Sequence, residues 1–182
     1  TQVGKLLMKQ AADGVKRVAL ELGGNAPFIV MDDADVEKAA DGVVASKFRA
    51  AGQTCVSANR IIAHGGIADR LTEAIAKRME TMKVGSGFEK GVQIGPLIHD
   101  EAVARVDELV QDAKKRGAKV VTGGSSLADE LGGAFYAPTL IEGGDNYALE
   151  LANFEIFGPV ASVYRADDER EILRLANDTP YG

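Results

Sequence analysis

The chain of 182 residues contains a single cysteine, no tryptophan and only two histidines. One cysteine cannot form an internal disulfide, which fits a reducing compartment, so we expect a cytoplasmic protein. No apolar run is long enough to span a bilayer, and no signal peptide is recognisable. The histidines are not in metal-ligand spacing with the cysteine or with each other, so we expect no metal site.

Basic residues are also in short supply, because 21 lysines and arginines face 27 acidic residues, for a formal net charge of −6. Without a basic excess to neutralise phosphates, the chain is not expected to bind nucleic acid or an anionic membrane. A complete Gly-X-Gly-X-X-Gly fingerprint after a strand is missing too. The content of 46% hydrophobic and 26% charged residues is that of an ordinary globular protein.

What is present is an alternation of strand-like and helix-like segments. Periodicity predicts helices over 4–14, 35–50, 67–79, 102–113 and 167–177, strands over 18–20, 28–31, 60–63, 119–122 and 161–164, and loops over 85–96 and 123–133. Strands that alternate with helices predict an α/β fold with a largely parallel open sheet flanked by helices.

The lone thiol, Cys55, follows Gly52-Gln53-Thr54 at the end of a predicted helix. Thiolates are nucleophiles, and reactive ones lie in partly exposed, polar surroundings. Gly52 removes side-chain bulk there, and free backbone N–H groups in such a turn stabilise an oxyanion. Free cysteine is nevertheless among the most buried residue types, so the local sequence alone favours a structural thiol.

Two other segments carry weaker signals. Glu21 precedes Leu22-Gly23-Gly24 at the end of the predicted strand 18–20, which is where active sites of α/β folds gather. A carboxylate there would suit a general base, but taken alone the segment favours a solvated acid at a loop edge. Residues 155–159, Glu-Ile-Phe-Gly-Pro, predict a rigid turn that in isolation indicates only a loop with a core phenylalanine.

Taken together and in this order, these motifs resemble the aldehyde dehydrogenase superfamily. Residues 21–27 resemble its glutamate signature, 48–55 its cysteine signature, 155–159 its nicotinamide-side loop, and 177–182 a later family segment. The resemblance covers the whole chain and implies that Cys55 is the nucleophile. Because the family's fold is longer, we expect a chain truncated at both ends: 1–23 a remnant of the nucleotide-binding domain and 24–182 an incomplete catalytic domain.

The resemblance implies an aldehyde substrate and NAD or NADP as cofactor. Cys55 would attack the aldehyde, with its own backbone N–H in the oxyanion hole, and Glu21 would activate the water that hydrolyses the resulting thioester. The cofactor-binding residues implied are Thr1, Gly4, Leu22, Gly23, Glu155 and Phe157. Thr1 and Gly4 look like part of the family's Gly-Ser-Thr-X-X-Gly turn.

Residues 46–49 and 56–60 around the cysteine are similar to the succinate-semialdehyde dehydrogenase branch. This likeness implies that Arg49 binds the distal carboxylate of the substrate, since a guanidinium matches a carboxylate in bidentate fashion. Glutarate semialdehyde is the alternative substrate, and a helix-end residue that contacts free carbonyls is the alternative role for Arg49. The full-length enzyme would be a homo-oligomer.

Two other classes of function stay open. A thiol hydrolase or acyltransferase would need a histidine base, and neither His64 nor His99 lies in a recognisable partner motif. A non-catalytic interaction or oligomerisation domain would keep the fold without the activity. We expect the isolated chain to be inactive as a dehydrogenase, because most of the cofactor site is missing from it.

Overall fold

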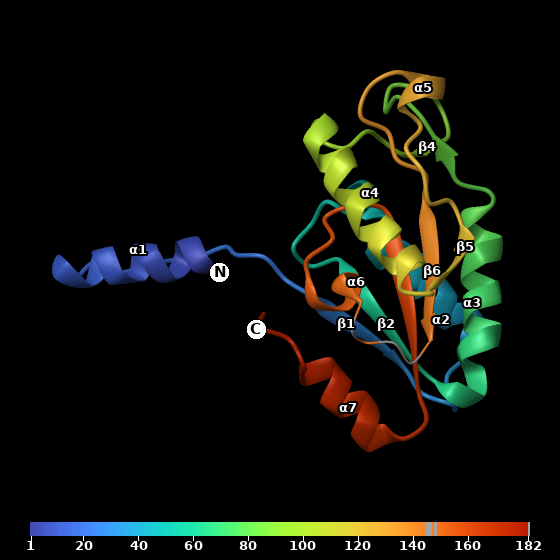
Figure 1. Ribbon diagram of the computed structural model, residues 1–182, viewed down its shortest axis with the longest axis horizontal. Helices are drawn as coiled ribbons and strands as arrows, with labels where there is room; N and C mark the ends of the chain where they lie inside the picture. The colour runs from blue at the N-terminus through green and yellow to red at the C-terminus, as the bar shows by residue number, and fades with distance from the viewer. Residues whose placement is uncertain (145–146, 148, 182) are drawn as a thin grey trace.

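The computed structural model describes residues 1–144, 147 and 149–181. Five strands form one sheet in the order β1-β2-β7-β6-β5 (Figure 1). Their bounds are β1 Ala26–Val30, β2 Ala58–His64, β5 Lys119–Thr122, β6 Thr139–Gly144 and β7 Val160–Ala166. Neighbouring strands run parallel except for β5, which is antiparallel to β6. The predicted α/β fold with a largely parallel sheet is confirmed.

Helices cover both faces of this sheet. On one face, α2 (Val36–Lys47) and α3 (Gly65–Met79) pack on each other and on β2 and β7. α7 (Glu169–Asn177) packs on β1 and β2, and α6 (Glu150–Asn153) contacts β2 and α4 (Asp100–Lys115). Other elements outside the main sheet are a parallel pair of short strands, β3 (Lys83–Val84) and β4 (Val92–Ile94), and the single turn α5 (Ala128–Leu131).

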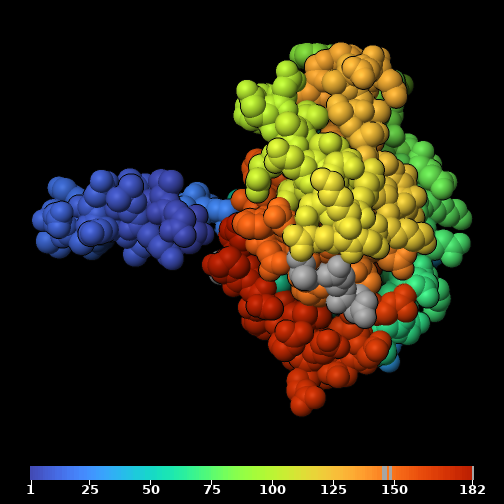
Figure 2. Space-filling view, viewed as in Figure 1, coloured from blue at the N-terminus to red at the C-terminus, as the bar shows by residue number. Residues whose placement is uncertain are grey.

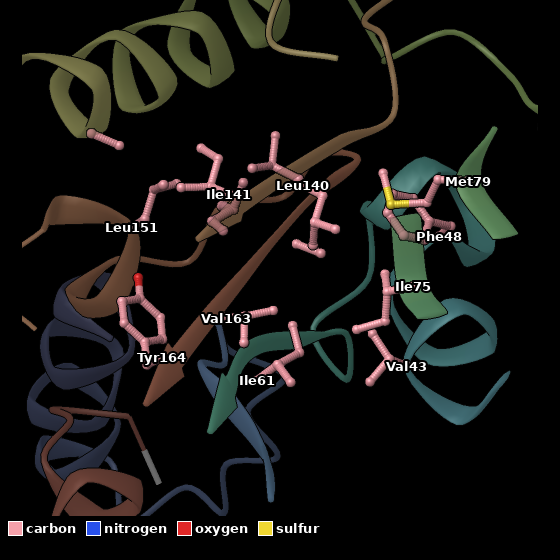
Figure 3. Packing of buried hydrophobic residues seen from close by; sticks show 14 of the residues in the cluster. Val43, Phe48, Ile61, Ile75, Met79, Leu140, Ile141, Leu151, Val163 and Tyr164 are labelled. Atoms are coloured by element: carbon pink, nitrogen blue, oxygen red, sulfur yellow. The ribbon is translucent and has the colours of Figure 1, made fainter. Parts of the chain in front are cut away.

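Strand β2 supplies apolar side chains to both layers. Ile61 belongs to the main core, together with Val43 of α2 and Ile75 of α3 (Figure 3). Ile62 belongs to a second cluster with Ile172 of α7. Successive strand residues point to opposite faces, so a strand covered on both sides needs a continuous apolar run. This explains why residues 60–63 predict a strand without alternation.

Helix α1 (Gln2–Asp13) stands apart from this body as an arm (Figures 1 and 2). Gly4 is the one buried residue of this helix, where it lies against the side chain of Leu22. Four apolar side chains of α1 are exposed: Val3, Leu6, Leu7 and Met8. The predicted helix at 4–14 is confirmed, but its apolar face is not covered by the rest of the described chain.

The strand predicted at Val18–Leu20 is wrong. Residues 16–25 are irregular, and no strand pairs with them among the described residues. A strand needs a neighbouring strand to accept and donate its backbone hydrogen bonds, so apolar residues alone do not make a segment a strand. Glu21 therefore lies in an exposed connection instead of at the end of a buried strand.

The helix predicted at 35–50 ends earlier, at Lys47. Ala50 and Ala51 take left-handed conformations, which an α-helix of L-residues cannot continue.

The segments predicted as loops, 85–96 and 123–133, contain strand β4 and helix α5. Strand β6 and helix α6 were not predicted. Gly182, the last residue of the family-like segment 177–182, lies outside the described residues. In the described part of the chain, no helix is long and apolar enough to cross a bilayer.

Candidate active site

The loop that carries Cys55 is a tight left-handed turn. It follows α2 through the 3-10 turn η1 (Arg49–Gly52), and Ala50, Ala51 and Gly52 have φ values of +50°, +54° and +74°. A left-handed alanine costs roughly 1 kcal/mol or more, so surrounding contacts must hold the turn in place. Gly52 is required here, because a β-carbon would collide with the carbonyl group of Gly158. Cys55 follows this turn with an exposed side chain.

Gly24 connects the segment that carries Glu21 to both other motifs. A β-carbon on Gly24 would collide with the carbonyl oxygen of Cys55. The Gly24 N–H donates a hydrogen bond to Oε1 of Glu155 at 3.1 Å, and a β-carbon on Gly23 would collide with the same carboxylate. Three motifs that are far apart in the sequence therefore meet at one stretch of backbone.

A buried polar pair lies behind Gly24. The side-chain Nδ2 of Asn59 donates to the Gly24 carbonyl at 3.2 Å, and Nζ of Lys47 donates to Oδ1 of Asn59 at 2.8 Å. Both Lys47 and Asn59 are buried. Burial lowers the pKa of the Lys47 amine from its ordinary value of 10.5 to about 7, and the negative charge of Glu155 opposes that shift.

Cys55 opens onto a cavity of about 530 Å³. Its lining consists of Gly24, Asn25, Ala26, Pro27, Cys55, Val56, Arg60, Ala176, Asn177, Thr179 and Tyr181. The guanidinium of Arg60 donates to the carbonyls of Asn25, Leu175 and Ala176. The last carbonyls of a helix lack intrahelical partners, so Arg60 ties the end of α7 to the glutamate segment. The family-like residues 177–181 therefore border the same cavity.

Glu21 and Arg49 are both exposed, and neither forms a hydrogen bond or ion pair with another part of the described chain. Glu21 is three residues from Gly24 and so lies on the segment that reaches Cys55. Arg49 begins η1, six residues before the thiol. The structure thus places both on backbone that converges on Cys55, with their side chains free to meet a ligand.

Four of the predicted cofactor-binding residues contact one another in two pairs. Gly23 touches Glu155, and Leu22 touches Gly4. Phe157, with φ of +54°, is 44% exposed, and Leu22 is 39% exposed. Apolar surface next to a carboxylate is the kind of lining that a flat ring with an attached ribose would need, since the carboxylate can accept a hydrogen bond from a ribose hydroxyl. Thr1 is the N-cap residue of α1, three residues before Gly4.

Sequence reasoning missed Lys47, Asn59 and Arg60. A signal for Lys47 was present, since it continues the spacing of Ala40 and Val43 on the buried face of the predicted helix. A cation on an apolar face is seldom buried without a partner, which should have prompted a search for one. In the described part of the chain, no three His, Cys, Asp or Glu side chains are grouped so as to hold a metal ion.

The comparisons with known proteins agree with this geometry. The model of the Aldehyde dehydrogenase family matches residues 1–182. Over its whole length the chain is 48% identical to a succinate-semialdehyde dehydrogenase [NADP(+)] from Escherichia coli and 45% identical to a glutarate-semialdehyde dehydrogenase from Pseudomonas putida, covering 37% of each. The crystal structure of succinate-semialdehyde dehydrogenase from Burkholderia pseudomallei matches with a TM-score of 0.93 at 44% identity, over 100% of this chain and 37% of that one.

The chain belongs to the aldehyde dehydrogenase family. It spans about 37% of the length of the curated relatives named above.

Proposed function

We propose that this chain is the thiol-bearing part of an NAD(P)-dependent aldehyde dehydrogenase that oxidises succinate semialdehyde or a similar substrate such as glutarate semialdehyde. The observation that most supports this function is the position of Gly24, which touches the backbone of Cys55 and donates to the carboxylate of Glu155. The names of the relatives support a semialdehyde as the substrate class.

In the proposed reaction, the Cys55 thiolate attacks the aldehyde carbon and forms a thiohemiacetal. The developing oxyanion lies within reach of the Cys55 N–H, which donates to no acceptor within residues 1–144, 147 and 149–181. NAD(P)⁺, when bound, would supply the acceptor for the hydride whose loss converts the thiohemiacetal to a thioester on the Cys55 sulfur. Glu21 then takes a proton from the water that attacks the thioester, and the acid and the thiolate are released.

The cofactor end of the site is assigned to Leu22, Gly23, Glu155 and Phe157. The Glu155 carboxylate would accept a hydrogen bond from a ribose hydroxyl, and the partly exposed Phe157 would hold the nicotinamide. Residues 1–23, with Thr1 and Gly4, belong to the nucleotide-binding domain in this proposal, and 24–182 to the catalytic domain. The uncovered apolar face of α1 supports that division. The proposed enzyme is a cytoplasmic homo-oligomer.

Arg49 is the proposed recognition group for the distal carboxylate. Its side chain is exposed and has no ion-pair partner in the described chain. A guanidinium in this state offers a planar pair of donors to a carboxylate, and such charge-assisted bonds are the strong ones. A semialdehyde that ends in a carboxylate would therefore be bound at both ends, by Arg49 and by Cys55.

A chimera tests the proposal, with residues 1–182 replacing the matched segment of the Escherichia coli relative. We expect it to oxidise succinate semialdehyde with NAD or NADP, and Cys55→Ala to abolish turnover. Glu21→Gln is expected to let the Cys55 thioester accumulate, which intact mass spectrometry detects. Ser57→Ala is the matched control, since it changes a small side chain two residues away. Turnover that survives Cys55→Ala would show that the thiol is not the nucleophile.

A further inference from the structure

Lys47 is fully buried at the end of α2, yet the proposed reaction gives it no task. Its amine donates to Asn59, Asn59 donates to the carbonyl of Gly24, and the N–H of Gly24 donates to Glu155. The Gly24 residue is therefore held on both sides, through its carbonyl and through its N–H. This chain of hydrogen bonds runs continuously from the cysteine-side helix to the cofactor-side loop.

Lys47 also touches the cysteine loop through its backbone. A β-carbon on Gly52 would lie only 3.2 Å from the Lys47 carbonyl oxygen, so the end of α2 forms the base of the turn that carries Cys55. One residue thus contacts the cysteine loop with its main chain and, through Asn59, the glutamate segment with its side chain. Lys47 is therefore placed to set the distance between the cysteine loop and the segment that carries Glu21.

We propose that Lys47 is a positioning residue that acts through Asn59 to hold Gly24, and with it the Glu21 segment, against the backbone of Cys55. The inference rests on the proposed function, because it concerns the relative placement of the nucleophile and the general base. Burying a lysine is costly, and an apolar side chain of similar volume often serves stability as well or better. The amine is retained where it fixes Oδ1 of Asn59, and through Asn59 the Gly24 carbonyl.

The first test uses the 182-residue chain and needs no activity. Asn59→Asp keeps an acceptor for Lys47 but removes the Nδ2 donor to the Gly24 carbonyl. Lys47→Met removes the amine and keeps the side-chain volume. We expect each substitution to accelerate hydrogen exchange of the Gly24 amide by about tenfold, measured by NMR relative to the Val163 amide in the sheet core. Lys38→Met, an exposed lysine on the same helix, is the control and should leave that ratio unchanged.

The second test measures turnover in the chimera. Lys47→Met and Asn59→Asp are expected to lower kcat by about tenfold or more, because a small misplacement of reacting groups is costly. KM for succinate semialdehyde should change by less than about twofold, since Arg49 is untouched. An unchanged Gly24 exchange ratio in both variants, or an unchanged kcat, would overturn the positioning role. An unmodified chimera that shows no turnover would instead overturn the proposed function, whatever the Gly24 amide does.

Discussion

Gly24 lies so close to the carbonyl oxygen of Cys55 that no side chain fits between them. This contact joins the segment carrying the proposed general base to the loop carrying the proposed nucleophile. Because the Gly24 N–H is also bound by Glu155, the cofactor-side loop is fixed to the same point. The relative placement of three loops thus depends on one residue having no β-carbon.

Gly24→Ala is therefore expected to lower the free energy of unfolding by roughly 1–3 kcal/mol, the usual cost of forcing extra volume into a packed position. Urea unfolding of the 182-residue chain measures the change. Gly87→Ala is the matched control, since a β-carbon there meets nothing within 4 Å, and it should shift stability by less than about 0.5 kcal/mol. Equal stabilities for the two variants would mean that the close approach of Gly24 to Cys55 is not present in solution.

The buried amine of Lys47 predicts a pH-dependent stability. Its pKa is lowered to about 7 in the folded chain, whereas the unfolded chain titrates near 10.5. Between those values the unfolded state binds more protons, so the free energy of unfolding rises with pH by up to about 1.4 kcal/mol per unit. The stabilisation is complete above 10.5 and is lost as the pH falls toward 7.

Urea unfolding at pH 7.5, 8.5 and 9.5 measures this slope. Lys47→Met should lack the Lys47 contribution, and the difference between the two proteins isolates it from every other group. The range stops below pH 10 because burial raises the pKa of Tyr136, Tyr147 and Tyr164 above the ordinary tyrosine value, which lowers stability at higher pH. If the free energy of unfolding changed with pH by the same amount in both proteins, the Lys47 amine would not have a lowered pKa in the folded chain.

The left-handed turn before Cys55 predicts that a substitution by glycine there raises stability. Ala50 has φ of +50° and is exposed, so Ala50→Gly relieves backbone strain without removing a buried side chain. After allowing for the greater entropy of the unfolded chain, we expect a gain of about 0.5 kcal/mol. Ala104→Gly, at an exposed position inside α4, should instead cost about 1 kcal/mol. Urea unfolding gives both values, and a loss of stability in both variants would contradict the left-handed turn.

The sequence indicated candidate residues for this site, but it did not indicate how the fold brings them together. Cys55, Glu21 and Glu155 were predicted as site residues because each lies in a short motif of specific residue types, and the structure brings the three motifs together at Gly24. The contacts of Gly24 with Cys55 and of Lys47 with Asn59 were not, since no local pattern reports which loops meet in space. The prediction of a strand at 18–20 was wrong for a related reason. Its apolar residues suit a strand, but strand pairing depends on neighbours elsewhere in the fold. The left-handed backbone at Ala50 and Ala51 was not predicted either, because a left-handed conformation is normally expected at glycine.

Arg60 is expected to be a main support of the cavity wall. Arg60→Met would leave the carbonyls of Asn25 and Ala176 without their donor and the Leu175 carbonyl with only the Asp178 N–H, and a buried unsatisfied group costs about 1–3 kcal/mol. We expect a loss of about 3 kcal/mol in urea unfolding, with faster amide exchange in α7. Arg105→Met, at an exposed position of α4, should change stability by less than about 0.5 kcal/mol. Normal exchange in α7 of the Arg60 variant would argue against its role as an anchor.

Arg49 offers the sharpest test of substrate class. If its guanidinium binds a distal carboxylate, Arg49→Gln in the chimera should reduce kcat/KM for succinate semialdehyde by about tenfold to a hundredfold, the range expected for a charge-assisted hydrogen bond. Butanal has the same chain length but no carboxylate, so its kcat/KM should change by less than about twofold. Arg70→Gln, an exposed arginine on α3, is the control for a general loss of positive charge. Equal losses for both aldehydes would place Arg49 in the folding of the cysteine loop instead of in substrate recognition.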